Sequence, residues 1–174
     1  MYLRKKICMY NLLKEREEII EILGIHFESL YKIPPLAGRI LALLIVDGCK
    51  SGLSFENIVV KLAASKSSIS TNINLLLKME LIYYITIIGD RKKYFKSAPL
   101  SQRLTSYLKM IAFEKQIIDK LQTYRERTIA CPEEQFNMQN VKVYKAHVSE
   151  VEELLIKTIE KFKKIEIDNS KNNY

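Results

Sequence analysis

Small polar side chains that can form hydrogen bonds are concentrated in ten consecutive positions of the chain. They are Ser65, Ser67, Ser68, Ser70, Thr71, Asn72 and Asn74. Short hydroxyl and amide side chains held on one surface can contact the base edges and phosphates of a nucleic acid. The same residue types are mediocre helix formers, because their side chains compete for backbone hydrogen bonds. The stretch is therefore either a polar linker or a helix with an unusual exposed face.

The apolar residues threaded through this stretch distinguish the two interpretations. At 100° per residue they form one stripe, made of Ile69, Ile73, Leu76 and Leu77. The opposite side holds Ser67, Thr71, Asn74 and Lys78, flanked by Ser68 and Ser70. A flexible linker would show no such separation. We therefore predict a helix over residues 66–79, with Ser65 as its N-cap.

The first turn of this predicted helix is suited to a negatively charged partner. It contains Lys66 and no acidic residue, although acids usually complement the helix dipole at that end. A phosphate would fill that role, and the free backbone N–H groups of a helix start bind anions. An ordinary solvated face is the alternative, but such faces are usually rich in Glu and Lys. The composition favours DNA recognition.

A basic β-hairpin is predicted immediately downstream, over residues 81–98. The run "LIYYITII" is β-branched and aromatic, "GDRK" marks a turn, and "KYFKSA" is typical of a returning strand. The tip carries Arg91, Lys92 and Lys93. Between Ser65 and Arg103 there are seven basic and two acidic residues, a net +5 over 39 residues. Each phosphate neutralised should steepen the salt dependence of binding by about 0.9 in log–log terms.

Further helices are predicted on both sides of these elements. Apolar spacing and breakers such as "KIPP" and Gly48 predict helices over 11–32, 35–48, 55–64, 99–129 and 149–165, with Ser54 as a second N-cap and a loop over 130–140. A short helix, a tight turn, a second helix and a hairpin form a winged helix-turn-helix. The predicted fold class is therefore mainly α with a small β-hairpin wing (α+β). We expect domain boundaries at 1–33, 34–98 and 99–174.

Composition and charge agree with a globular protein and exclude little more. The 174 residues are 48% hydrophobic and 28% charged, and the net charge is +8. That excess suits a polyanionic partner, although a solvated Lys-rich surface explains it equally well. The run "ILALLIV", over Ile40–Val46, is too short to span a membrane, and the N-terminus has no signal-peptide core. We expect a soluble, cytoplasmic protein.

The residues that commonly perform catalysis or bind metals are sparse and scattered. Cys8, Cys49 and Cys131 are widely separated and have no Cys-x-x-Cys or nearby histidine, so neither zinc nor a disulfide framework is expected. Incidental thiols are the simpler interpretation, with a redox sensor as the alternative. His26 and His147 are isolated, and there is no phosphate-binding glycine loop. We expect no enzyme activity, no metal and no cofactor.

Three motifs in fixed order resemble a known family. "PLAGRIL" at 35–41, "SKSSIS" at 65–70 and "GDRKKY" at 89–94 lie within residues 34–96. This region resembles the winged-helix core of bacterial MarR-type transcriptional regulators, and more closely the GbsR-type branch. The resemblance implies a homodimer that binds a pseudo-palindromic operator in double-stranded DNA, expected to act as a repressor. A winged helix that binds protein or RNA is the alternative.

The resemblance also implies how the parts would be used. The helix 66–79 would lie in the major groove, the wing 89–93 in the minor groove with Arg91 leading, and Asp90 would orient its basic neighbours. The helices of segments 1–33 and 99–174 would form the dimer. The family often senses small molecules between these parts, although no residue identifies a ligand. The expected DNA contacts are Ser65, Lys66, Ser67, Ser68, Ser70, Thr71, Asn74, Lys78, Arg91, Lys92 and Lys93.

Overall fold

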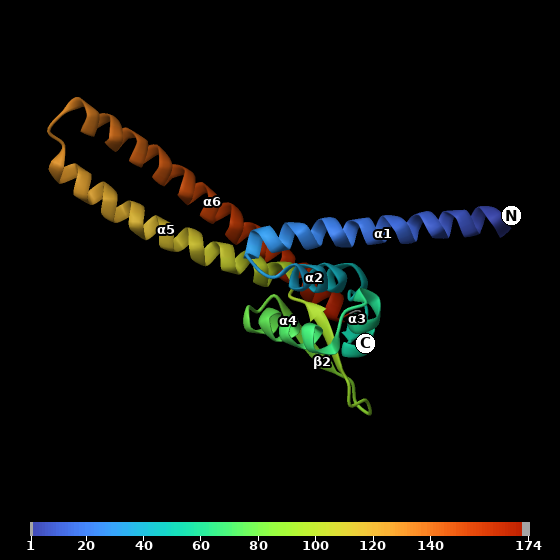
Figure 1. The fold of residues 1–174 in the computed structure, drawn as a ribbon. Coiled ribbons are helices and arrows are strands. Elements are labelled where there is room, and N and C mark those ends of the chain that lie inside the picture. The colour runs from blue at the N-terminus through green and yellow to red at the C-terminus, as the bar shows by residue number, and fades with distance from the viewer. Residues whose placement is uncertain (1, 172–174) are drawn as a thin grey trace. The chain divides into compact units, whose positions relative to one another are not determined.

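A computed structural model describes the backbone of residues 2–171 and the side chains of residues 11–169 (Figure 1). The described chain divides into two compact units between Ala98 and Pro99. The first contains α1 (Tyr2–Tyr31), α2 (Pro35–Asp47), β1 (Leu53–Ser54), α3 (Phe55–Leu62), α4 (Lys66–Lys78), β2 (Ile82–Thr86) and β3 (Lys93–Ser97). The second contains α5 (Leu100–Thr128) and α6 (Pro132–Lys171).

The core of the first unit is built around α2. This helix is apolar on nearly all sides, as expected for a helix covered by neighbours on several faces. Its residues Ile40, Leu41 and Leu44 are buried with Ile58 of α3 and with Ile69 and Leu76 of α4. One continuous core therefore joins the helices of the helix-turn-helix and fixes the inward face of α4.

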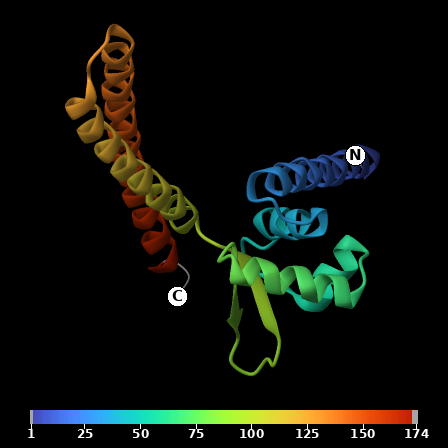
Figure 2. The ribbon, with the colours of Figure 1, turned by 60° about the vertical axis from the view of Figure 1, so that its left-hand side comes forward.

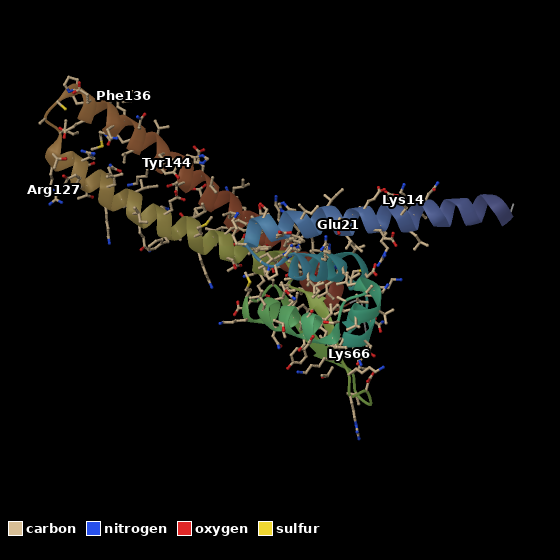
Figure 3. All side chains as sticks on the ribbon, in the orientation of Figure 1. Lys14, Glu21, Lys66, Arg127, Phe136 and Tyr144 are labelled. Carbon is tan, nitrogen blue, oxygen red and sulfur yellow. The ribbon has the colours of Figure 1, made fainter. Side chains whose placement is uncertain are left out.

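Two glycines allow α1 and α2 to cross at short distance. A Cβ atom on Gly38 would lie 2.4 Å from the carbonyl oxygen of Gly24, so a side chain there would force the helices apart. Beside this crossing, Arg39 of α2 donates from its Nε to Glu21 of α1 at 2.7 Å, and the contact lowers the pKa of Glu21. Glu21 is labelled in Figure 3. The "AGR" part of the first motif thus has a structural role in joining α1 to α2.

An ion-pair cluster joins α1, α2 and α3. Asp47, at the end of α2, accepts from both Arg16 of α1 and Lys61 of α3. The Arg16 Nε–Asp47 Oδ1 distance is 2.7 Å, and the Lys61 Nζ–Asp47 Oδ2 distance is 2.9 Å. The hydrogen bond from Arg16, supported by Lys61, lowers the pKa of Asp47 to about 2.

The predicted hairpin is present, and it belongs to a three-stranded antiparallel sheet of order β1-β3-β2 (Figure 2). Tyr84 of β2 and Leu53 of β1 both pair with Phe95, on the two sides of β3. The sequence did not predict β1, which is only two residues long and pairs with residues about 40 positions away. The helix, helix and hairpin order confirms the predicted winged fold class.

The second unit is an antiparallel helical hairpin, and here one prediction was wrong (Figures 1 and 2). Residues 130–140 were predicted as a loop and the last helix as 149–165, but α6 already begins at Pro132 and continues to Lys171. Pro132 in the first turn, followed by Glu133 and Glu134, is a helix start. Glu134 also accepts from the backbone N–H of Ala130 at 2.7 Å.

The interface between α5 and α6 is thin and partly polar. Ile118, Val141 and Val148 are buried there, with Ile111 packed against them. At its base, Glu166 accepts from both the backbone N–H of Ser101, at 3.2 Å, and the Ser101 hydroxyl, at 2.6 Å. This contact satisfies an N–H group that the first turn of α5 would otherwise leave unpaired.

Candidate nucleic-acid interface

The start of α4 is organised by its serines. Ser65 is the N-cap, and its Oγ accepts from the backbone N–H of Ser68 at 3.2 Å. The same oxygen lies 2.8 Å from the Ser68 hydroxyl and 3.1 Å from that of Ser67. Lys66 follows the cap (Figure 3), and the first turn holds no acidic residue. The predicted N-cap is confirmed, and it presents a hydroxyl cluster at the positive end of the helix dipole.

The two faces of α4 are those predicted from the spacing. Ile69, Ile73 and Leu76 are buried, and Leu77 is half-buried. The side chains predicted to contact DNA from this helix are all exposed: Ser65, Lys66, Ser67, Ser68, Ser70, Thr71, Asn74 and Lys78. The poor helix formers are therefore held in helical conformation by the core beneath them.

Two polar side chains of α4 bond back to their own helix. Thr71 Oγ1 donates to the Ser67 carbonyl at 3.0 Å, and Asn72 Nδ2 donates to the Ser68 carbonyl at 2.8 Å. Asn72 is buried. Within residues 11–169, the side chains of Ser70 and Asn74 have no hydrogen-bond partner. Asn74 therefore presents both an amide donor and a carbonyl acceptor to solvent, whereas Thr71 presents its remaining acceptor capacity and its methyl group.

The wing tip is a braced turn. Asp90 N donates to the Ile87 carbonyl at 2.9 Å, and Gly89 adopts a φ of +84°. The Asp90 carboxylate then accepts from the backbone N–H of Lys92 at 2.9 Å and from the Tyr94 hydroxyl at 2.7 Å. The bond from Tyr94, followed by that from Lys92, lowers the pKa of Asp90. These contacts hold the backbone that carries Arg91 and Lys92.

Basic side chains surround this turn. Arg91, Lys92 and Lys93 are all exposed, and the Lys93 Nζ lies 4.1 Å from the centroid of the Tyr84 ring. The three basic residues line a surface hollow of about 330 Å³ together with Phe55, Glu56 and Phe95. The wing thus meets the first turn of α3 at a cationic recess.

Glu56 is a charged neighbour that sequence reasoning missed. Its own backbone N–H, the Ser54 hydroxyl and the charges of Lys92 and Lys66 lower its pKa. Lys66 of α4 and Lys92 of the wing therefore both act on one carboxylate of α3. No sequence signal could have found it, because Glu56 is 36 positions from Lys92 and the fold alone brings them together.

The other candidate sites are unremarkable in the described part of the chain. Residues 11–169 contain no group of three metal-ligating side chains. Cys49 is exposed and Cys131 half-buried, while the side chain of Cys8 lies outside the described residues. None of the helices within residues 2–171 combines the length and the apolar character needed to cross a membrane.

The arrangement of α2, α3, α4 and the sheet defines a winged helix-turn-helix protein. No family model matches the chain. A curated relative, the HTH-type transcriptional regulator MmpR5 of Mycobacterium tuberculosis, is 38% identical over 82 residues, or 47% of this chain. That match spans about half the length of the relative, 48%. The resemblance to helix-turn-helix transcriptional regulators is thus confirmed, and the GbsR-type branch stays a prediction.

One solved structure shares the fold, and a second is similar at a lower level. One described as a transcriptional regulator superimposes with a TM-score of 0.57 at 23% identity, covering 86% of this chain and 99% of that one. MepR, a transcription regulator of the Staphylococcus aureus multidrug efflux pump MepA, gives a TM-score of 0.39 at 18% identity over 80% of this chain and 97% of that one.

Proposed function

We propose that this chain is a sequence-specific regulator of transcription that binds double-stranded DNA. One observation carries the proposal: a face of short, neutral, hydrogen-bonding side chains on α4 lies in the same compact unit as a braced basic wing. In the proposed complex α4 occupies the major groove and residues 89–93 approach the minor groove. The relative that is a transcriptional regulator supports this role.

The side chains of α4 suit base edges because they are short. Asn74 can bond an adenine in bidentate fashion, and serine and threonine hydroxyls can donate to or accept from any base. Lys66, Lys78 and the first turn of α4 would contact phosphates, which fix position without reading sequence. The Ser65 hydroxyl already bonds the hydroxyls of Ser67 and Ser68, so we assign these three serines to phosphate contact. We assign Ser70, Thr71 and Asn74 to base contact.

The wing would supply the electrostatic part of binding. Arg91 is exposed beside the turn, and narrow A·T-rich minor grooves attract arginine. Lys92 and Lys93 would neutralise the flanking phosphates. The Asp90 carboxylate accepts hydrogen bonds from Lys92 N and from the Tyr94 hydroxyl, so we expect it to position these groups without touching DNA.

The second unit supports a homodimer. Its helix α5 exposes five large apolar residues at steps of three and four positions: Met110, Phe113, Ile117, Leu121 and Tyr124. Helix α6 adds Phe136, Val143, Leu154 and Ile165, which share one side of that helix. Large contiguous apolar surface is usually covered by a partner. A second copy of the chain would cover this surface and form a symmetric dimer. The dimer would place two copies of α4 on a pseudo-palindromic operator. It would then act as a cytoplasmic repressor by blocking the promoter.

A selection experiment tests the proposal. The full-length protein is incubated with a random duplex library, and the recovered sequences are measured by fluorescence anisotropy at several salt concentrations. We expect an enriched inverted repeat and a binding constant that falls steeply with salt. Equal competition by single-stranded or duplex RNA, or no enrichment of any sequence, would favour the alternative of a winged helix that binds RNA or protein.

A matched pair of arginine variants localises the contact. Arg91→Ala should weaken binding several-fold and reduce the salt slope by up to about 0.9, because the groove loses one cation that would displace counterions from the DNA. Arg127→Ala removes the same charge from α5 in the other unit and should leave both values unchanged. Equal effects of the two variants would mean that net charge alone drives binding.

A further inference from the structure

The wing tip carries an aliphatic side chain that the proposed contacts do not use. Ile88 has a relative exposure of 105%, the highest of the exposed large hydrophobic residues described, and its neighbour Ile87 is 45% exposed. Of the run "LIYYITII", only Leu81 and Ile82 are buried in the core. Packing within the unit therefore does not explain an isoleucine at position 88.

The local backbone does not require an isoleucine either. Residues 87–90 form a turn closed by the Asp90 N–Ile87 O hydrogen bond, with Gly89 at positive φ. This is the pattern of a type II turn, in which Ile88 takes the position that proline usually favours. A β-branched residue gains nothing there from turn geometry. The side chain points away from the fold on a backbone that Asp90 holds through Lys92 N and Tyr94.

The setting of Ile88 indicates what could cover it. Arg91, Lys92 and Lys93 lie within five positions and give the tip a strong positive charge, which is complementary to a nucleic-acid backbone. An apolar protein partner would have to desolvate these three cations at the same time. A DNA groove would pair the cations with phosphates and offer the C–H surfaces of its sugars to the isoleucine.

We propose that Ile88 is an apolar DNA contact, which packs against the deoxyribose walls of the minor groove beside Arg91. The minor groove is about 6 Å wide, so an aliphatic side chain that enters it is closely flanked by sugar atoms. Other proteins that bind the minor groove also insert apolar side chains into it, where these side chains can wedge between base pairs. The inference rests on the proposed DNA binding, and it adds a contact that carries no charge.

The absence of charge gives the proposal a distinct signature. Ile88→Ser should weaken binding to the duplex recovered by selection by about tenfold, because apolar area is no longer removed from water. The salt slope should stay at the wild-type value, since no phosphate contact is lost. Ile88→Val keeps most of the apolar surface and should bind within about twofold of wild type. Arg91→Ala, measured in parallel, should lower both affinity and slope.

The same titrations separate the possible failures. Wild-type affinity in Ile88→Ser, together with weakened Arg91→Ala, would overturn the inference and leave the proposed function intact. A lowered salt slope in Ile88→Ser would also overturn it, because the loss would then be electrostatic. If the wild-type protein binds no duplex, the proposed function itself fails. As a control for folding, both Ile88 variants should have the same melting temperature as the wild-type protein.

Discussion

The two units of the chain solve the burial of apolar residues in different ways. Residues 2–98 enclose a core to which α1, α2, α3, α4 and the sheet all contribute, and the surface they expose on α4 is small and polar. In the second unit, α5 and α6 bury Ile118, Val141 and Val148 between them and leave more large apolar side chains outside than inside. The first unit therefore has a hydrophobic core of its own, whereas the core of the second unit is small and much of its apolar surface is exposed.

This difference assigns separate tasks to the two units. A unit with its own core can present poor helix formers such as Ser67, Ser70 and Asn74, because packing holds the helix. A helical hairpin with a thin core gains stability mainly when another surface covers its apolar stripe. We therefore expect reading of DNA to depend on α4 and the wing of the first unit, and assembly on the second unit together with α1, which exposes Leu12, Ile19 and Ile22.

The largest effect is expected where assembly is broken. Changing Phe113 and Ile117 together to glutamate places two charges in the exposed apolar stripe of α5, where Phe113 is 64% exposed. We expect a monomer by light scattering and an apparent loss of affinity for the selected duplex of about a hundredfold or more, because two half-sites are no longer bound together. Gln116→Glu, also exposed on α5, is the control. A dimer that survives the double change would refute the assignment.

The next effect concerns base reading by α4. Asn74→Ala should cost roughly 1–3 kcal/mol on the selected duplex, the value of a lost bidentate base contact, and little on random DNA. Thr71→Ala should cost less, because the Thr71 hydroxyl already donates to the Ser67 carbonyl. Asn140→Ala, exposed on α6, is the matched control. Equal losses on both duplexes would instead assign these residues to phosphates.

A third prediction compares the acid stability of the units. The pKa of Asp47 is about 2 in the folded protein and near its ordinary value of 3.8 in the unfolded chain. The ionised carboxylate therefore stabilises the fold above pH 4, and this stabilisation is lost as the pH falls through 2. The loss should be about 2 kcal/mol. In urea titrations followed by circular dichroism, Asp47→Asn should remove this part of the pH dependence, and Asp168→Asn in α6 should not. An unchanged pH profile in Asp47→Asn would show that the cluster around Asp47 does not stabilise the first unit.

The smallest effect is expected at the base of the helical hairpin. Ser101→Ala removes the hydroxyl that donates to Glu166 and should lower the free energy of unfolding by about 1 kcal/mol. Ser106→Ala, exposed on the same helix, should be neutral. The comparison is made by urea unfolding of the full chain. If the two variants unfold alike, the contact with Glu166 does not contribute to stability.

The sequence was most informative where local signals coincide with the fold. The two faces of α4, the N-caps Ser54 and Ser65 and the hairpin each follow from residues within a few positions of one another. Strand β1 and the neighbourhood of Glu56 depend on contacts between distant segments, which no local pattern encodes. The loop predicted at 130–140 was wrong because its polar composition outweighed the helix start at Pro132.

The candidate site shows the same division. The residue types and the helix that carries them could be read from the chain, and all eleven predicted contacts are exposed in the structure. The hydrogen bonds that distinguish these eleven residues from one another could not be predicted from the sequence. Only the structure shows that Thr71 and the serines of the first turn bond locally, that Asn74 does not, and that Asp90 braces the turn under Arg91.

The close crossing at Gly24 and Gly38 has a mechanical consequence. Backbone meets backbone there without an intervening side chain, and Arg39–Glu21 and Arg16–Asp47 clamp the same two helices on further turns. Helices in such contact cannot slide past one another without breaking several bonds at once. We therefore expect a displacement of α1 to move α2 with it, and through the shared core to shift α4, the helix that we propose reads DNA.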